Sequence, residues 1–268
     1  MTSLTLINDH WLGAATPKNY APAVAALADL LNPVNAVRFP YTALPSQPNR
    51  AHGIDYSNEI LHHIETATTL LNREQPDRLL NLACDCGSEF APIAYLLSRY
   101  RDSMTVFWFD AHADLNTPGT SPSGHFHGMV LRALTGHESF DFSPNHPLSP
   151  KQVVLLGARD LDPAERDYIE AERIRLIPPT QVAELCWLPQ GVTRAYVHID
   201  FDVLDPNEFP WVGCPTRAGI SLASLRQALQ HLHDHSEIVG LSAVEISANG
   251  DNAAAAASIA RDLLHYFL

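Results

Sequence analysis

Short apolar runs alternate along the chain with longer segments in which apolar residues recur every three or four positions. The short runs predict buried strands, at residues 3–7, 78–84, 104–110, 153–159, 173–178, 195–202 and 238–247. The longer segments predict amphipathic helices, at residues 21–31, 58–72, 91–101, 162–172, 221–233 and 253–267. Apolar strands that alternate with such helices are typical of an α/β fold with a mainly parallel sheet covered on both faces.

The composition adds that one domain over residues 1–268 is expected. The chain is 46% hydrophobic and 18% charged, and no linker or change in composition divides it. No run approaches the ~18 apolar residues of a membrane span, and the opening "MTSLTLINDHWLG" does not resemble a secretory signal. Four cysteines in this length do not make a disulfide scaffold, so a cytoplasmic protein is expected.

The formal net charge of −13 argues against a nucleic-acid partner, which requires a basic face. A negative field mildly favours a cationic substrate. If several aspartates converge in one site, bound cations would offset part of the negative net charge.

Polar residues gather where five of the predicted strands end. The motifs are "CDCGS" (84–88), "DAHADLN" (110–116), "RDLDPAE" (159–165), "DFDVLDP" (200–206) and Glu245. One aspartate at a strand end would indicate only a helix cap or a turn. Five strands of a parallel sheet place their carboxyl ends at one edge, so these motifs together predict a ligand-binding site there.

Two of these motifs have the spacing of metal ligands. Residues two apart in an extended strand point to the same face, which aligns the five side chains Asp110, His112, Asp114, Asp200 and Asp202. Buried carboxylates repel one another and are costly to desolvate, so such a cluster is expected to bind cations. Oxygen-rich ligation favours Mn²⁺ over Zn²⁺, and the number of carboxylates suggests two ions that share bridging aspartates.

The segments "DAHADLNTPGTSPSGHFHG" (110–128) and "DFDVLDP" (200–206) closely resemble the ureohydrolases, and arginase in particular. The resemblance covers the chain from about residue 78 onward, whereas the first 75 or so residues match poorly. It implies a three-layer α/β/α arginase-like domain with two manganese ions, bridged by Asp110 and Asp200. By the same resemblance Asp114 completes one ion's ligands, and His112 and Asp202 complete those of the other.

The resemblance also implies substrate-binding residues. Asn116 and Ser123 match the residues that bind the α-carboxylate of an amino acid, and Asp162 the residue that holds its α-amino group, with Glu165 nearby. His127 matches a proton-transferring histidine, and Glu245 the carboxylate that pairs with the guanidinium. Cys214 stands where arginases commonly carry a cleft-lining threonine. Asn116 and Ser123 are also ordinary turn formers, and "LDPAE" is also a good helix start.

The stretch "ACDCG" (83–87) departs from the family. By themselves Cys84 and Cys86 could be core residues, a redox pair or metal ligands, although C-x-C is short for a redox pair. The resemblance places Asp85 on the aspartate of the arginase motif "GGDHS" and Cys86 on its metal-binding histidine. Either Cys86 binds the ion, or the first site is weakened, or the metal preference changes. Cysteine at this position also occurs in an arginase-like branch that acts on Nω-hydroxy-L-arginine.

The remaining histidines and cysteines are expected outside the metal shell. His62, His63, His231, His233 and His235 are predicted at the surface. His125 and His198 lie close to the motifs, where they could contact the ligands from behind, but neither is assigned as a metal ligand. Cys84 and Cys186 are expected to be packing residues.

The sequence therefore predicts a manganese-dependent hydrolase that cleaves the guanidino group of L-arginine or a close analogue to urea and an amine. Nω-hydroxy-L-arginine is the alternative substrate. A catalytically idle relative that binds a metal or an amino acid is the alternative from another class. The expected partner is a small guanidino molecule, without nucleic acid or membrane, and family members form homo-oligomers.

Overall fold

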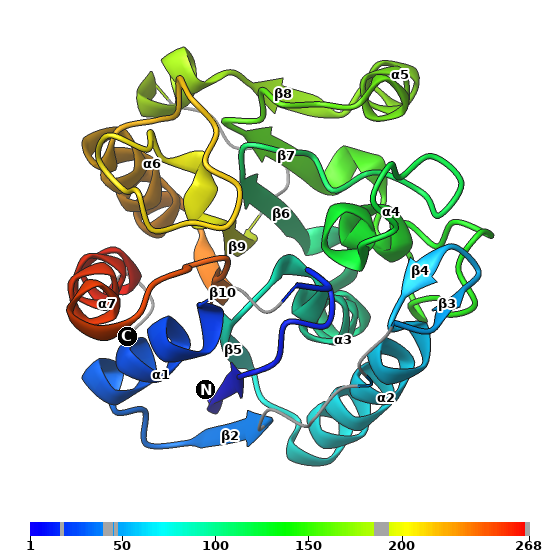
Figure 1. Ribbon diagram of the computed structural model, residues 1–268, viewed down its shortest axis with the longest axis horizontal. Coiled ribbons are helices and arrows are strands. Elements are labelled where there is room, and N and C mark those ends of the chain that lie inside the picture. Colours follow the sequence, from blue (N-terminus) through cyan, green and yellow to red (C-terminus); the bar gives the residue numbers. More distant parts are fainter. Residues whose placement is uncertain (17–18, 40–44, 46–47, 185–192, 266–268) are drawn as a thin grey trace.

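A computed structural model describes residues 1–268 except 17–18, 40–44, 46–47, 185–192 and 266–268. Its main sheet has eight strands in the order β2-β1-β5-β10-β9-β6-β7-β8, and all neighbours are parallel (Figure 1). The strands are β1 Ser3–Asn8, β2 Ala36–Phe39, β5 Arg78–Ala83, β6 Met104–Phe109, β7 Val153–Leu156, β8 Arg175–Ile177, β9 Arg194–Ile199 and β10 Glu237–Ala243. The predicted parallel α/β fold is confirmed.

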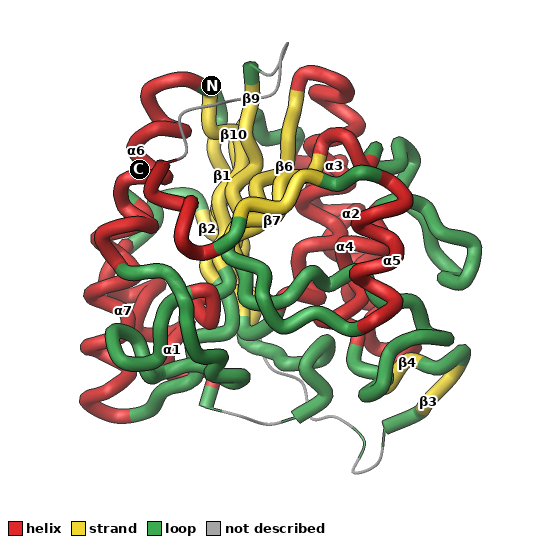
Figure 2. Tube along the Cα trace, turned by 90° about the horizontal axis from the view of Figure 1, so that it is seen from above, coloured by secondary structure: helices red, strands yellow, loops and turns green. Residues whose placement is uncertain are grey.

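Helices cover both faces of this sheet. Figure 2 shows α1, α6 and α7 on one side and α2, α3, α4 and α5 on the other. They are α1 Tyr20–Leu31, α2 Ser57–Glu74, α3 Phe90–Tyr100, α4 Val130–Leu134, α5 Pro163–Glu172, α6 Leu222–His235 and α7 Gly250–Leu264. Short 3-10 helices are η1 Cys86–Glu89, η2 Arg101–Ser103, η3 Phe126–Met129, η4 Pro150–Gln152, η5 Pro179–Glu184 and η6 Phe201–Val203.

All seven predicted strands and all six predicted helices are present, with shifted ends. The predicted strand 153–159 stops at Leu156 and the predicted strand 238–247 stops at Ala243, because their polar ends leave the sheet to form loops. The last residues of the predicted helix 253–267 lie outside the described residues, as does Cys186.

Three short strands were not predicted. Strand β2 lies at the edge of the sheet, and its four residues have no buried face, so the apolar pattern is missing. Strands β3 Arg50–Ala51 and β4 Ile54–Asp55 form a two-residue antiparallel pair that is too short to show a period.

The centre of the sheet is close-packed. Every residue of β6 is buried, which explains its unbroken apolar sequence. Gly240 in β10 lies against Tyr196 of β9, where an added Cβ would come within 2.2 Å of the tyrosine ring. The register of β10 on β9 shifts between Ile238 and Gly240. A larger side chain at residue 240 would therefore force these strands apart.

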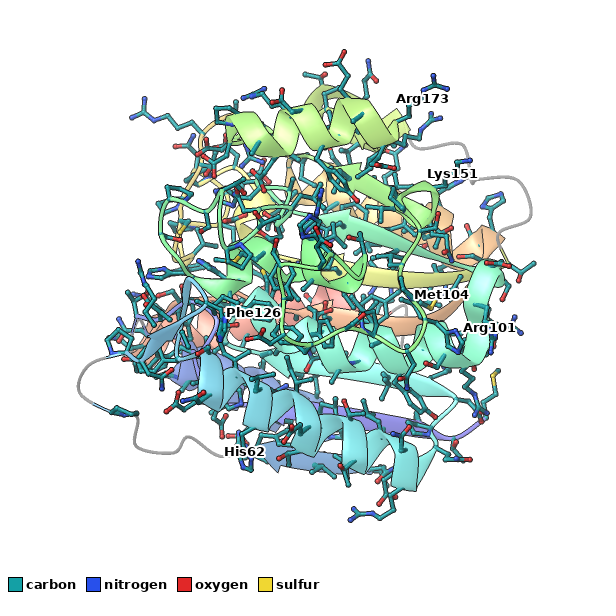
Figure 3. All side chains as sticks on the ribbon, turned by 90° about the vertical axis from the view of Figure 1, so that its right-hand side faces the viewer. His62, Arg101, Met104, Phe126, Lys151 and Arg173 are labelled. Atoms are coloured by element: carbon teal, nitrogen blue, oxygen red, sulfur yellow. The ribbon has the colours of Figure 1, made fainter. Side chains whose placement is uncertain are left out.

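The parallel sheet brings the ends of distant strands together. Met104 begins β6, and Phe126, which follows the loop after β6, lies toward the other end of the strands (Figure 3). The segments after β5, β6, β7, β9 and β10 carry the predicted site residues and meet at this carboxyl edge. Within the described part of the chain, no helix is long and apolar enough to cross a membrane.

Candidate metal centre and active site

The predicted ligands converge from two neighbouring strands. Asp110, His112 and Asp114 follow β6, and Asp200 and Asp202 follow β9. The four carboxylates are at most 4% exposed. Ligand atoms of Asp110, His112 and Asp202 all lie within 4.8 Å of one another.

His112 lies between two of these carboxylates. Its Nδ1 is 3.3 Å from Asp110 Oδ1 and 3.2 Å from Asp202 Oδ2. Burial alone would lower the pKa of His112, but the hydrogen bonds to Asp110 and Asp202 outweigh it and raise the pKa. An imidazole between two carboxylates shows that this position attracts positive charge.

For three of the four carboxylates, burial and mutual repulsion outweigh any such compensation. Burial, with repulsion from neighbouring carboxylates, raises the pKa values of Asp110, Asp114 and Asp200 above the ordinary aspartate value. Asp114 Oδ2 is buried without a hydrogen-bond partner among the described residues. A cation bound here would supply that partner and offset the repulsion, so the residues fit a metal centre.

Backbone and side-chain donors fix the carboxylates. Asp110 accepts hydrogen bonds from the backbone N–H of His112 at 2.7 Å and from Trp108 Nε1 at 3.0 Å. Asp200 accepts from the N–H of Asp202 at 2.8 Å, and Asp202 from the N–H of Ala111 at 3.1 Å. These bonds orient the oxygens before any ligand binds.

Cys86 begins η1 and joins the same cluster. It is 1% exposed, and its Sγ lies 3.3 Å from Asp200 Oδ2. Burial, reinforced by the carboxylates around it, raises the pKa of the thiol well above its usual value. Cys86, Asp200 and Glu245 form a further group whose ligand atoms lie within 4.8 Å of one another. The structure therefore places the thiol where a ligand was expected, while Cys84 is fully buried in the core.

Asp85 holds the loop that carries Cys86. It accepts hydrogen bonds from the N–H groups of Gly87 at 2.8 Å and Gly13 at 3.0 Å. Burial and the nearby charge of Glu245 raise the pKa of Asp85 to about 7. An added Cβ on Gly13 would lie 2.3 Å from Asp85 Oδ1, so this contact needs glycine.

His127 and Glu245 form the other side of the site. His127 Nδ1 lies 2.9 Å from Glu245 Oε1. Burial opposes the charged form of His127, but the hydrogen bond and charge of Glu245 raise its pKa overall. The imidazole can therefore hold a proton beside the cluster.

A cavity of about 200 Å³ opens over these groups. Its lining includes every predicted substrate-binding position, namely Asn116, Ser123, Asp162, Glu165 and Cys214. Asn116 Nδ2 donates to Asp162 Oδ2 at 2.8 Å, which ties together the two positions expected to recognise an amino-acid head group. The tertiary structure thus brings together residues far apart in the sequence.

Glu165 has a structural task in addition. Its Oε1 accepts from the N–H of Leu115 at 2.9 Å and its Oε2 from the N–H of Asp162 at 2.9 Å. The side chain is 3% exposed and fixes the start of α5 against the loop after β6.

Sequence patterns did not identify three residues that support the site, Gly13, Trp108 and Arg159. Gly13 donates to Asp85 and Trp108 donates to Asp110. Arg159 donates to five backbone carbonyls, those of Gly157, Asp202, Val203, Thr216 and Arg217. The motif "RDLDPAE" contains Arg159, whereas no local pattern marks Gly13 or Trp108. His198, which the sequence placed close to the motifs, lies against Cys86.

Among the histidines predicted at the surface, His62, His233 and His235 are exposed, whereas His63 and His231 are half-buried. His63 lies with its Nδ1 2.9 Å from Nε2 of the buried His10. His63 is part of α2, and the pair belongs to none of the candidate metal-ligand groups found in the described residues.

A parallel eight-stranded sheet with buried carboxylates, an imidazole and a thiol at its carboxyl edge defines an α/β protein with a candidate metal centre. By sequence, the chain belongs to the arginase family, because the model of the Arginase family matches residues 56–268.

Individual relatives agree with this assignment. The chain is 34% identical to an arginase of Bacillus subtilis over 170 residues, 56% of this chain and 55% of that protein. It is 31% identical to an arginase of Bacillus caldovelox over 184 residues, 63% of this chain and 61% of that protein. The alignments thus span little more than half of these curated relatives.

The folds agree over nearly the whole chain. An Entamoeba histolytica arginase solved with L-ornithine superposes with a TM-score of 0.84 at 21% identity, covering 98% of this chain and 99% of that one. A formimidoylglutamase of Bacillus subtilis gives a TM-score of 0.72 at 15% identity, covering 98% of this chain and 85% of that one. At these identities the likeness shows the fold.

Proposed function

We propose that this chain is a binuclear manganese hydrolase that cleaves the guanidino group of L-arginine, or a close analogue, to urea and an amine. One observation carries the proposal: the carboxylate cluster, the His127–Glu245 pair and the Asn116–Asp162 pair line one cavity. Family membership and the named arginase relatives support it.

The ligands of the ions would be Cys86, Asp110, His112, Asp114, Asp200 and Asp202. Two divalent cations, with manganese the expected pair and other transition metals able to substitute, would be held by these residues and would supply the acidity that makes a water nucleophilic near neutral pH. The buried carboxylates then hold positive charge in place of repelling one another.

The chain's own residues orient the substrate and move the proton. Glu245 pairs with the guanidinium, and Asp114 stabilises the carbon centre while water adds and the C–N bond to the side chain breaks. His127 transfers the proton that the leaving amine needs, so that water and the guanidinium yield urea and an ammonium product. Asn116, Ser123 and Asp162, with Glu165 and Cys214 beside them, recognise the amino-acid end.

The decisive experiment offers the metal-loaded protein L-arginine, Nω-hydroxy-L-arginine, agmatine and formiminoglutamate side by side. Urea or formamide release and the amine product are measured. L-arginine is expected to turn over, and failure with all four substrates would contradict the proposal.

The position of Cys86 in the ligand cluster favours Nω-hydroxy-L-arginine as the second candidate substrate. A higher kcat/KM with the hydroxylated substrate would select it. The remaining alternative is a catalytically idle protein that binds a metal or an amino acid. The Cys86→His variant distinguishes this alternative from an active enzyme: turnover by the variant, with none by the wild type, would favour the idle protein. We further propose that the chain folds as a single domain, is located in the cytoplasm, binds a small guanidino molecule and forms homo-oligomers.

A further inference from the structure

The buried histidine His198 lies against Cys86. It is the fifth residue of β9, is 0% exposed and does not line the cavity. Its Nε2 lies 3.7 Å from Cys86 Sγ. Ligand atoms of Cys86, Asp110 and His198 lie within 4.8 Å of one another, which makes a group that the site described above does not use.

The separation of sulfur and nitrogen fits two ligands of one ion. Typical bond lengths of ~2.3 Å to a thiolate and ~2.0 Å to an imidazole, at a tetrahedral angle, put the two atoms about 3.5 Å apart. The observed separation of 3.7 Å is close to this value.

The surroundings of His198 direct the lone pair of Nε2 toward Cys86. Its Nδ1 lies 3.2 Å from Ser242 Oγ and 3.5 Å from Glu89 Oε2. Glu89 is itself held by Asn81 Nδ2 at 2.6 Å and by the hydroxyl of Tyr196 at 2.7 Å. A carboxylate behind Nδ1 favours the proton on that nitrogen, as it does in metal-binding histidines.

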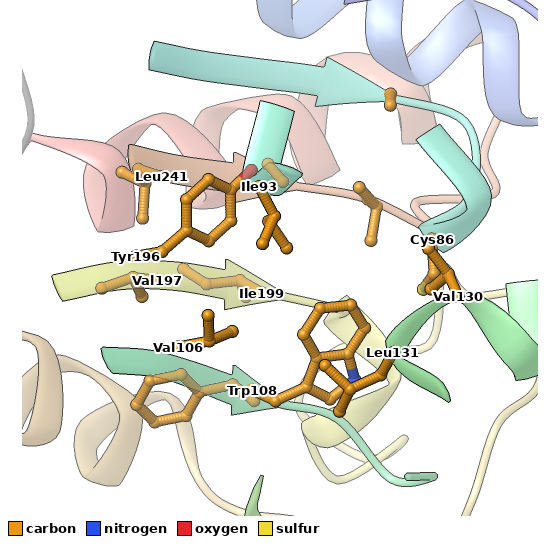
Figure 4. Packing of buried hydrophobic residues seen from close by; sticks show 14 of the residues in the cluster. Cys86, Ile93, Val106, Trp108, Val130, Leu131, Tyr196, Val197, Ile199 and Leu241 are labelled. Carbon is orange, nitrogen blue, oxygen red and sulfur yellow. The ribbon is translucent and has the colours of Figure 1, made fainter. Parts of the chain in front are cut away.

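Trp108 fixes two members of this group at once. Its indole stacks on the His198 ring with centroids 3.5 Å apart and planes 12° apart, and its Nε1 donates to Asp110. Figure 4 shows Trp108 and Cys86 toward the end of the sheet to which the strand arrows point. The ligand atoms are therefore held by rigid neighbours.

We propose that His198 Nε2 and Cys86 Sγ form a nitrogen–sulfur pair that, with Asp110, binds one of the two cations. This position selects a softer ion such as Zn²⁺ or Co²⁺, because thiolate and imidazole ligands prefer such ions to Mn²⁺. The oxygen-rich group Asp110, His112 and Asp202 takes the Mn²⁺. The inference rests on the proposed function in assuming that the cluster binds two cations, and it replaces one of the two manganese ions proposed there by a softer ion.

The test uses the full chain stripped by a chelator and reloaded with Co²⁺. A thiolate-to-cobalt absorption band in the near ultraviolet reports Cys86, and paramagnetically shifted imidazole N–H protons in the NMR spectrum report each bound histidine. We expect the band, together with two shifted protons. One of the two should exchange slowly in D₂O because the Nδ1 of His198 is fully buried.

Variants assign the signals. His198→Gln should remove the slowly exchanging proton, His112→Gln the other one, and Cys86→Ser the absorption band. His10→Gln is the matched control, since His10 is also buried but lies outside the cluster, and it should change none of them. Melting curves by circular dichroism show whether each variant folds. If His198→Gln does not fold, Glu89→Gln keeps the ring and should weaken Co²⁺ binding by about 10- to 100-fold.

Competition between metals completes the test. From an equimolar mixture of Zn²⁺ and Mn²⁺, the wild type should retain about one of each per chain, and Cys86→Ser should lose the preference for zinc. A single shifted proton that disappears in His112→Gln, with unchanged binding in Glu89→Gln, would overturn the proposal. Absence of turnover with both shifted protons present would instead contradict the proposed function alone.

Discussion

His127 Nδ1 donates to Glu245 Oε1 over 2.9 Å, across a separation of 118 residues in the sequence. The pair links the histidine proposed to transfer protons to the carboxylate proposed to hold the guanidinium. Because Glu245 raises the pKa of His127, the imidazolium persists at a higher pH than an isolated imidazole would allow.

Replacing His127 by Asn should lower kcat by about 10²- to 10⁴-fold, the usual contribution of a positioned acid or base. Metal content measured by elemental analysis should stay unchanged, since no metal is assigned to this ring. His125→Asn is the control, because its ring lies 5.9 Å away on the same segment and should leave kcat within a few fold. Equal losses in the two variants would contradict the assignment.

Asn116→Ala should weaken recognition of the amino-acid end. Loss of a hydrogen bond to a charged group costs about 1.5–3 kcal/mol, or roughly 10- to 100-fold in affinity. Calorimetry should show this loss for L-ornithine and little change for putrescine, which lacks the carboxylate. A similar loss for both ligands would mean that Asn116 acts only through its bond to Asp162.

Glu165→Gln should lower the free energy of unfolding by about 1–3 kcal/mol, because one of two buried backbone N–H groups loses its acceptor. Urea denaturation measures the effect. Glu172→Gln on the exposed side of α5 removes a charge of the same kind and should have almost no effect. If both variants are equally stable, Glu165 does not hold the start of α5.

Arg159→Lys should destabilise the protein by about 2–4 kcal/mol. The guanidinium donates to five carbonyls that join the segments after β7 and β9, and an ammonium group cannot span them. Exposed Arg166→Lys is the matched control and should melt with the wild type. Unchanged stability of Arg159→Lys would show that water replaces these bonds.

His10 predicts an acid-sensitive contribution to stability. Burial lowers its pKa to about 4, so the folded protein keeps it neutral while the unfolded chain binds a proton below about pH 6.5. The contribution of neutral, buried His10 to the free energy of unfolding is therefore present above pH 6.5 and is lost as the pH falls toward 4. Relative to His10→Gln, the wild type should lose about 2–3 kcal/mol between pH 7 and pH 4.5. Exposed His62→Gln should follow the wild type, and equal slopes in all three proteins would contradict the expectation.

The sequence by itself predicted much of the fold because its signals are local. The unbroken apolar run of β6 and the helical spacing of α2 or α6 each need only neighbouring residues to be recognised. The expectation that Asp110, His112 and Asp114 share one face likewise follows from the two-residue period of an extended strand. Edge strand β2 has no such pattern and was missed.

The sequence thus determined the parallel α/β architecture, the edge at which the candidate site lies and the acidic residues that gather there. Only the tertiary structure decided what supports them: Gly13 binds Asp85 across 72 residues, Trp108 stacks on His198, and Arg159 joins two loops. These contacts depend on strand order and on the close approach of backbones, which no local period encodes. Periodicity therefore placed the ligands, whereas packing between distant strands decided how each one is held.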